Sequence, residues 1–113
     1  MSEKYIVVVS SNEMGHGDPE LGKTLMKAFI HNLTEQESLP EKILFYNTGA
    51  LLVEKGADTV EDLELLADKG VWIGTCGTCV NYFELEDKVA IGEISNMTEI
   101  VKNMYSYDRV VQP

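Results

Sequence analysis

The sequence predicts an α/β fold in which a mainly parallel five-stranded sheet lies between two layers of helices (α/β/α). Short apolar runs rich in β-branched residues alternate with amphipathic helical segments along the whole chain. The opening run is not interrupted by polar residues, which is typical of a parallel strand covered on both faces. The 113 residues are enough for one domain with its own core and too few for two. We therefore expect a single domain over residues 1–113.

The first part of the chain is predicted to form a strand, a helix and a second strand. Residues 5–10 (YIVVVS) form the first strand, and a polar loop follows over residues 11–17. Asp18 and Pro19 suit the N-cap and the first residue of a helix. The second strand is expected over residues 42–46. The buried face of the helix is expected at four-residue spacing: Leu21, Leu25, Phe29 and Leu33.

The middle of the chain is predicted to contain a short helical segment, a helix and the third strand. The short segment spans residues 50–55. Thr59 and Asp62 resemble a capping box that starts the helix, and Gly70 suits its left-handed end. The third strand spans residues 71–75. The buried stripe of the helix is expected to be Val60, Leu63, Leu66 and Ala67.

The last part is predicted to add two strands and one helix. The fourth strand is expected over residues 89–94, with Gly92 as a weak point, and the fifth over residues 109–112. Asn96 and Glu99 are suited to capping the last helix. Its buried face is expected to comprise Met97, Ile100, Val101, Met104 and Tyr105.

The charge restricts the partners. The formal charge is −10, from 19 acidic and 9 basic residues. Nucleic acid and anionic membranes need a basic surface, so we expect neither as a partner. A basic protein partner is compatible with this charge, although acidic residues also simply keep a protein soluble. The sequence has neither an apolar run of ~20 residues nor the features of a signal peptide, so we expect a cytoplasmic protein.

The two cysteines, Cys76 and Cys79, directly follow the predicted third strand. In the cytoplasm such a CxxC pair indicates redox, transfer or metal chemistry rather than a structural disulfide. No Lys or Arg lies between Cys76 and Glu84. Backbone N–H groups around Gly77 and Thr78, with a helical turn behind them, must therefore stabilise a thiolate.

Three loops are expected to meet beside the cysteines, because ligands of parallel sheets bind at the carboxyl ends of the strands. We predict Cys76 and Cys79 as the reactive residues. His16 is suited to assist them if the first loop folds over the thiols. Gly15-His16-Gly17 matches no nucleotide-binding motif. The residues predicted to bind substrate are Asn12, Gly15, His16, Gly17, Asn47, Gly77 and Thr78.

Four functions fit this CxxC pair. The first is transfer of a sulfane sulfur carried as a persulfide. The second is disulfide reduction, although the motif lies later in the chain than in thioredoxin-like proteins. The third is metal binding, which would need two subunits because two cysteines and His16 fall short of four ligands; no metal or other cofactor is assigned. The fourth is a non-catalytic, regulatory or ligand-binding module.

The chain resembles the DsrE/DsrF-like sulfur-relay family over nearly its whole length. The resemblance rests on the first strand with its Ser/Asn/Gly-rich loop and on residues 46–49 (YNTG). It also rests on residues 70–79 (GVWIGTCGTC). Residues 15–18 (GHGD) with residues 21–22 (LG) are most similar to the C-terminal domain of YedF-type selenium-metabolism proteins.

This resemblance implies a DsrE-like three-layer fold and a homo-oligomer, a trimer or a hexamer. It implies that Cys76 holds a persulfide received from a small SirA/TusA-like protein, and that Cys79 is a second cysteine found in some members. Tyr82-Phe83-Glu84 stands where single-cysteine members tend to have an Arg-Gly pair. YedF-type relatives also carry a SirA-like domain that is not present in this sequence.

The function predicted from the sequence is a carrier that holds sulfur or selenium on Cys76 and passes it to a protein partner, with Cys79 as a helper or resolving thiol. Whether such a sulfurtransferase-type carrier counts as an enzyme is left open. The alternative is a non-enzymatic regulatory or ligand-binding module whose CxxC is redox-active or binds a metal.

Overall fold

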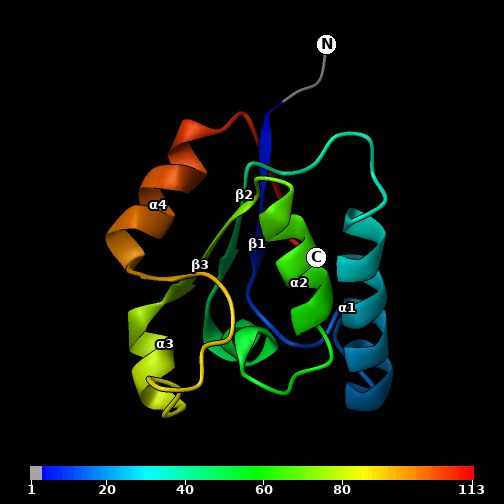
Figure 1. Ribbon diagram of the computed structural model, residues 1–113, viewed down its shortest axis with the longest axis vertical. Helices are drawn as coiled ribbons and strands as arrows, with labels where there is room; N and C mark the ends of the chain where they lie inside the picture. Colours follow the sequence, from blue (N-terminus) through cyan, green and yellow to red (C-terminus); the bar gives the residue numbers. More distant parts are fainter. Residues whose placement is uncertain (1–3) are drawn as a thin grey trace.

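The computed structural model describes residues 4–113 and confirms the predicted fold class. Within these residues a five-stranded, all-parallel sheet has the strand order β4-β3-β2-β1-β5 (Figure 1). The strands are β1 (Tyr5–Val9), β2 (Lys42–Phe45), β3 (Trp72–Cys76), β4 (Glu93–Ser95) and β5 (Arg109–Val111). The helices are α1 (Pro19–Leu33), the 3-10 helix η1 (Asn47–Val53), α2 (Val60–Asp68), α3 (Gly77–Tyr82) and α4 (Met97–Ser106).

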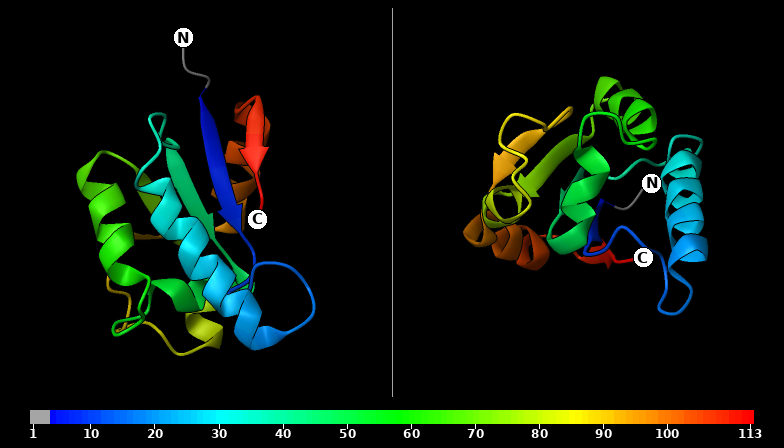
Figure 2. Two further views of the ribbon diagram at one scale, coloured as in Figure 1. Left: turned by 90° about the vertical axis from the view of Figure 1, so that its right-hand side faces the viewer. Right: turned by 90° about the horizontal axis from the view of Figure 1, so that it is seen from below.

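Helices cover both faces of the sheet. Figure 2 shows α1 and α2 on one face and α4 on the other. Because side chains alternate between the faces of a strand, the sheet contributes to two separate buried clusters. One cluster joins Val7, Val9, Ile43, Phe45 and Ile73 to residues of α1 and α2. The other joins Ile6, Val8, Leu44 and Cys76 to Ile100 of α4. Cys76 therefore belongs to the smaller cluster, beneath α4.

Most of the expected helix ends are confirmed. The Oδ1 of Asp18 accepts a hydrogen bond from the N–H of Leu21 at 2.9 Å. The Oδ1 of Asn96 accepts one from the N–H of Glu99 at the same distance. Gly70 has φ +101°, as the end of α2 requires. Among residues 4–113, no helix is both long enough and apolar enough to cross a membrane.

The capping box expected at Thr59 is wrong. Thr59 makes no side-chain cap to α2. Its buried hydroxyl instead donates a hydrogen bond to the carbonyl oxygen of Leu52, at 2.7 Å. A buried hydroxyl needs a hydrogen-bond partner, and for Thr59 this partner is the Leu52 carbonyl in η1 rather than an N–H group of α2.

The predicted buried face of α1 is wrong at its first two positions, because Leu21 and Leu25 are 56% and 43% exposed. A four-residue step turns a helix by about 40° more than one full turn, so a strict four-residue stripe drifts around the axis. The apolar side chains that contact the core lie one position later, joined by Leu33 at the end of the helix. The buried residues of α1 are Gly22, Met26, Ile30 and Leu33.

The predicted buried face of α4 is also wrong in part. Its exposed apolar residues are Met97, Val101 and Tyr105, whereas Ile100 is fully buried as expected. Asn103 is buried in their place, and it is well bonded there. Its Oδ1 accepts a hydrogen bond from the Nζ of Lys42 at 2.8 Å, and its Nδ2 donates one to the Glu99 carbonyl. This pairing allows a polar side chain to face the sheet.

The fourth strand is shorter than predicted and begins after Gly92 rather than at residue 89. Gly92 has φ +89°, which is incompatible with extended strand geometry. The segment before it instead makes an isolated antiparallel bridge between Val89 and Glu54. The short strand β4 then runs beside the end of β3 and pairs Ser95 with Cys76.

Candidate functional site

Cys76 lies where β3 passes directly into α3. It is the last residue of the strand and the N-cap residue of the helix, with φ −59° and ψ 125°. A Cβ atom at Gly77 would lie 3.2 Å from both the Ile94 Cγ2 atom and the Ser95 carbonyl oxygen. Glycine therefore allows α3 to begin close against β4, so that the chain can turn immediately after the thiol.

Both thiols are free among the described residues, but they differ in exposure. Cys76 is 3% exposed and packs with Ile6, Val8 and Leu44. Cys79, one turn later on α3, is half-buried and contacts the same cluster. The pair thus has one enclosed sulfur and one sulfur nearer to solvent.

The surroundings move the pKa values of the two thiols in opposite directions. Burial raises the pKa of Cys76, but the backbone N–H groups of Cys79 and Thr78 and their side chains outweigh it, so the pKa lies below its ordinary value. The Cys76 side chain does not cap α3 through a hydrogen bond from an N–H group of the first turn. The N–H groups therefore act on the sulfur mainly as oriented dipoles. Cys76 is the thiol favoured as a thiolate.

Cys79 is favoured in the protonated form. Burial raises its pKa, and the adjacent Cys76 sulfur raises it further. The N–H of Asn47 donates a hydrogen bond to the Cys79 sulfur at 3.0 Å, and this contact alone acts in the opposite direction. A protonated Cys79 can donate a hydrogen bond to the Cys76 thiolate, which is the arrangement expected of an activated CxxC pair.

The second loop reaches the thiols through its backbone. Asn47 has φ +53°, a left-handed conformation that asparagine tolerates better than most residues. Behind it, a Cβ atom at Gly49 would lie 2.3 Å from the carbonyl oxygen of Val9. This close approach holds the beginning of η1 against the end of β1. The loop is therefore fixed where the N–H of Asn47 can face Cys79.

A cavity of about 450 Å³ opens beside the two thiols. Its lining includes Thr78, Cys79 and Tyr82 of α3, the helix that Figure 1 shows near the end of β3. Among the described residues, those that line it carry no charged side chain. The ring of Tyr82 meets that of Phe83 edge to face, with 5.1 Å between centroids. The lining residues are Tyr46, Asn47, Cys76, Thr78, Cys79, Tyr82, Phe83 and Met97.

The structure brings together the predicted site residues of the second and third loops. Asn47, Thr78 and both cysteines line one cavity, and Gly77 joins two of them along the chain. The aromatic and Met97 side chains of this cavity are missing from the sequence-based prediction. Tyr82 and Phe83 could have been predicted as part of the site, because they follow Cys79 by only three and four residues. Met97 was expected on the buried face of the last helix, because the sequence does not show that the start of this helix lies beside the cavity.

The predicted residues of the first loop lie apart from this cavity. The base of the loop contacts the second loop, where the N–H of Asn12 donates to the Thr48 Oγ1 atom at 3.2 Å. The loop then turns back to α1, and the N–H of Met14 donates to the Gly22 carbonyl. Figure 2 shows it extending beside the start of α1, away from α3. Gly15, His16 and Gly17 are exposed there, so their predicted role in binding stays a prediction.

Residues 4–113 contain no group of three or more His, Cys, Asp or Glu side chains arranged to hold a metal ion.

Comparisons with known proteins agree with this fold. The YchN protein of E. coli has the same fold, with a TM-score of 0.75 and 18% identity over 99% of this chain and 100% of its own. MTH1491 of Methanobacterium thermoautotrophicum, a protein of unknown function, has a TM-score of 0.71 and 16% identity over the same shares. No curated protein sequence matches the chain. The sequence profile of the DsrE/DsrF-like family matches residues 3–113. The chain therefore belongs to the DsrE/DsrF-like family.

Proposed function

We propose that the protein carries a sulfane sulfur on Cys76 and passes it to a protein partner. The observation that carries this proposal is the asymmetry of the thiol pair. Cys76 has a lowered pKa and Cys79 a raised one, and both line one cavity. Transfer of this kind needs one activated thiolate and an approach for another thiol, and it needs no acid–base triad.

Loading is a balanced exchange. The Cys76 thiolate attacks the outer sulfur of a donor persulfide, R–S–SH. A new S–S bond forms to Cys76 while the S–S bond of the donor breaks, and its electron pair leaves on the donor thiolate R–S⁻. The product is Cys76–S–SH, with no oxidant or reductant consumed. Attack by an acceptor thiolate on the outer sulfur reverses the roles and restores the Cys76 thiolate.

Cys79 has two roles in this scheme. As a thiol, it donates a hydrogen bond that stabilises Cys76 both as nucleophile and as leaving group. As a thiolate, it attacks the inner sulfur of the persulfide, which expels hydrosulfide and leaves a Cys76–Cys79 disulfide. Its raised pKa slows the second reaction, because less thiolate is present. The raised pKa of Cys79 thus limits this loss of the cargo at neutral pH.

The proposed cargo includes selenium. A thiolate that accepts a sulfane sulfur also accepts selenium from R–S–SeH, by the same exchange of bonds. The resemblance to YedF-type proteins supports testing it. The proposed partner is a small SirA/TusA-like carrier in the cytoplasm, and the proposed assembly is a trimer or a hexamer. Tyr82, 80% exposed at the cavity, offers an apolar contact for a docking protein.

Intact-protein mass tests the proposal. Wild type, Cys76→Ser and Cys79→Ser are incubated with a protein-bound persulfide or with a selenopersulfide donor, R–S–SeH, and are then compared before and after reduction. We expect a reducible gain of about 32 Da for sulfur or about 79 Da for selenium. The gain should be lost in Cys76→Ser and kept in Cys79→Ser. Uptake that survives Cys76→Ser excludes Cys76 as the carrier.

A redox module is the second candidate, because the two thiols of the pair act on each other directly. In that case wild type should lose about 2 Da as Cys76 and Cys79 form a disulfide, and Cys79→Ser should show no gain of sulfur or selenium. Neither single variant should show this loss. A ligand-binding or metal-binding regulatory role would instead leave the mass of wild type and of both variants unchanged.

A further inference from the structure

The outer side of α4 carries an apolar stripe that begins at the cysteine cavity. Met97, Val101 and Tyr105 follow one another at four-residue spacing and are 51%, 41% and 88% exposed. Side chains four residues apart lie on the same face of a helix. Met97 also lines the cavity beside Cys76 and Cys79. The stripe is therefore continuous with the candidate site.

Two exposed apolar side chains of the neighbouring elements extend this stripe. Tyr82 of α3 lines the cavity, and Ile94 belongs to the edge strand β4. Figure 1 shows α3 and α4 on the same side of the molecule. A helix that packs one face against a sheet usually has polar residues on its other face, and an apolar outer face is typical of an interaction surface. We name the following residues the α4 surface: Tyr82, Ile94, Met97, Val101 and Tyr105.

Acidic residues accompany the α4 surface. Residues 77–108, which form α3, β4 and α4, contain six acidic residues and two lysines. Glu84 directly follows Phe83 of the cavity wall, and Glu99 lies in the first turn of α4. Among residues 4–113 neither carboxylate forms an ion pair, whereas two carboxylates on the α1 side of the sheet pair with lysines. Both are therefore available to the cations of a partner.

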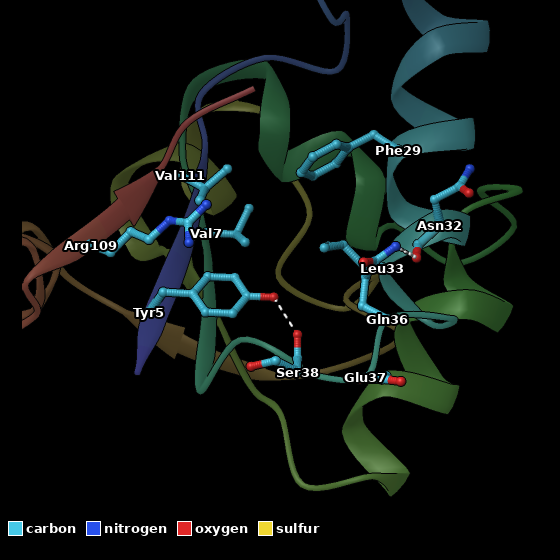
Figure 3. Close-up of a pocket in the computed structure, with 10 residues that line it drawn as sticks. All are labelled: Tyr5, Val7, Phe29, Asn32, Leu33, Gln36, Glu37, Ser38, Arg109 and Val111. Carbon is cyan, nitrogen blue, oxygen red and sulfur yellow. Dashed lines mark hydrogen bonds between the residues drawn. The ribbon is translucent and has the colours of Figure 1, made fainter. Parts of the chain in front are cut away.

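The hollow beside α1 is less suited to docking. Figure 3 shows this hollow, of about 660 Å³, between α1 and β5. Half of the residues that line it are polar, and the Tyr5 hydroxyl donates a hydrogen bond to the Ser38 carbonyl there, at 2.7 Å. It shares no lining residue with the cysteine cavity. A protein that brings sulfur to the thiols would therefore contact the α4 surface instead.

We propose that the α4 surface docks the sulfur donor, and that this donor is a basic protein with apolar side chains beside its persulfide cysteine. The proposal rests on the carrier function proposed for Cys76. At about 450 Å³, the cavity has room for a side chain as well as the sulfur. This side chain lies between Met97 and Tyr82, while lysine or arginine side chains face Glu84 and Glu99. A second copy of this chain fits poorly, because it would bring negative charge against negative charge.

Disulfide exchange with short peptides tests the proposal on the full chain carrying Cys79→Ser, so that a mixed disulfide persists. Each peptide has one cysteine joined to thionitrobenzoate. The Cys76 thiolate attacks the peptide sulfur, a new S–S bond forms, and the electron pair of the old bond leaves on coloured thionitrobenzoate. Rates are expressed relative to alkylation of Cys76 by iodoacetamide, which corrects for any change in the thiol itself.

Four matched peptides separate apolar contact from charge. They carry either Phe or Ser at two alternate positions beside the cysteine, and either Lys or Glu further along. Extended backbone places alternate residues about 6.6 Å apart, close to the rise of about 6 Å between Met97 and Val101 along α4. We expect the Phe–Lys peptide to react at least about 10-fold faster than the Ser–Glu peptide, as burial of one Phe side chain alone would give.

Variants then locate the contact. Val101 does not line the cavity, so slower reaction of the Phe–Lys peptide with Val101→Ser, by about 3-fold or more, reports docking along α4. Leu21→Ser, at an exposed position of α1, is the matched control and should change nothing. Glu99→Gln should reduce the advantage of Lys over Glu peptides, and so should salt, whereas Glu64→Gln on exposed α2 should not.

Three results would overturn the proposal: equal rates for the four peptides, equal rates for Val101→Ser and Leu21→Ser, or self-association of wild type in sedimentation velocity that Val101→Ser abolishes. The last would assign the α4 surface to a second copy of the chain. Sulfur uptake in the mass test together with equal peptide rates would refute the docking surface and keep Cys76 as the carrier. Peptide selectivity without sulfur uptake would refute the carrier and keep the docking surface.

Discussion

Replacement of Asn47 by valine is expected to change both the stability of the fold and the pKa of Cys79. At φ +53° the residue holds its N–H on the Cys79 sulfur, 3.0 Å away. A β-branched residue in this conformation costs about 1–2 kcal/mol, whereas glycine adopts it freely. Asn47→Val should therefore be about 1–2 kcal/mol less stable than Asn47→Gly.

The expected size can be converted into a melting temperature. Unfolding entropy is about 2.1 cal/mol/K per residue near 60 °C, so the 113 residues contribute about 240 cal/mol/K. A loss of about 1–2 kcal/mol then lowers Tm by about 4–8 °C. Calorimetry or urea unfolding of the two variants measures this difference. Asn81→Val, at an exposed position in α3, is the control and should change stability by less than about 0.5 kcal/mol.

The same variants test the contact to sulfur. The N–H of Asn47 lowers the pKa of Cys79, so turning it away in Asn47→Val should raise that pKa further. Alkylation of Cys79 by iodoacetamide, followed by peptide mass across a range of pH, should then shift to higher pH. Equal stability of Asn47→Val and Asn47→Gly, with unchanged alkylation of Cys79, would refute the reasoning.

Three further predictions follow from other features of the fold. Gly49→Ala should destabilise the protein by more than about 2 kcal/mol in urea unfolding, because its Cβ would lie 2.3 Å from a backbone carbonyl oxygen of β1. Thr75→Val should stabilise it by about 1 kcal/mol, because among residues 4–113 the Thr75 hydroxyl is buried with no hydrogen-bond partner shown. Iodoacetamide should modify Cys76 at lower pH than Cys79, since the pKa of Cys76 lies below its ordinary value and that of Cys79 above it.

Each of these predictions has a clear contrary result. A fully stable Gly49→Ala would mean that the start of η1 can move away from β1. A destabilised Thr75→Val would mean that the hydroxyl has a bonding role. Alkylation of Cys79 before Cys76 would mean that exposure, rather than thiolate character, governs the reaction, since Cys76 is the more enclosed of the two sulfurs.

The fold could be predicted from the sequence because its signals are local. The uninterrupted run of β1, the cap at Asp18 and the turn at Gly70 each depend on a few neighbouring residues. The buried faces of the helices depend instead on rotation about the axis, which accumulates along the helix. That is why Leu21 was assigned to the core and Met26 is the residue that fills it.

The candidate site was predictable only where the chain itself brings residues together. Cys76 and Cys79 are joined by one turn of α3, and parallel pairing of β2 with β3 brings Asn47 to the same edge. The first loop also begins at that edge, but it is long enough to fold either toward the cysteines or back toward α1. Its direction is set by the bond from Met14 to Gly22, and neither residue type indicates such a pairing in advance.

The way in which the Cys76 thiolate is stabilised favours some sulfur donors over others. N–H groups of α3 lower the pKa of Cys76, and no charged side chain lines the cavity among the described residues. A chain of net charge −10 repels free anionic donors such as polysulfide, and none of the described residues that line the cavity carries a positive side chain to offset this repulsion. A persulfide carried on a basic protein is attracted by the same charge. The electrostatics therefore favour delivery by a protein, and salt should weaken that delivery more than it alters the reactivity of Cys76, because the N–H dipoles lie directly at the sulfur.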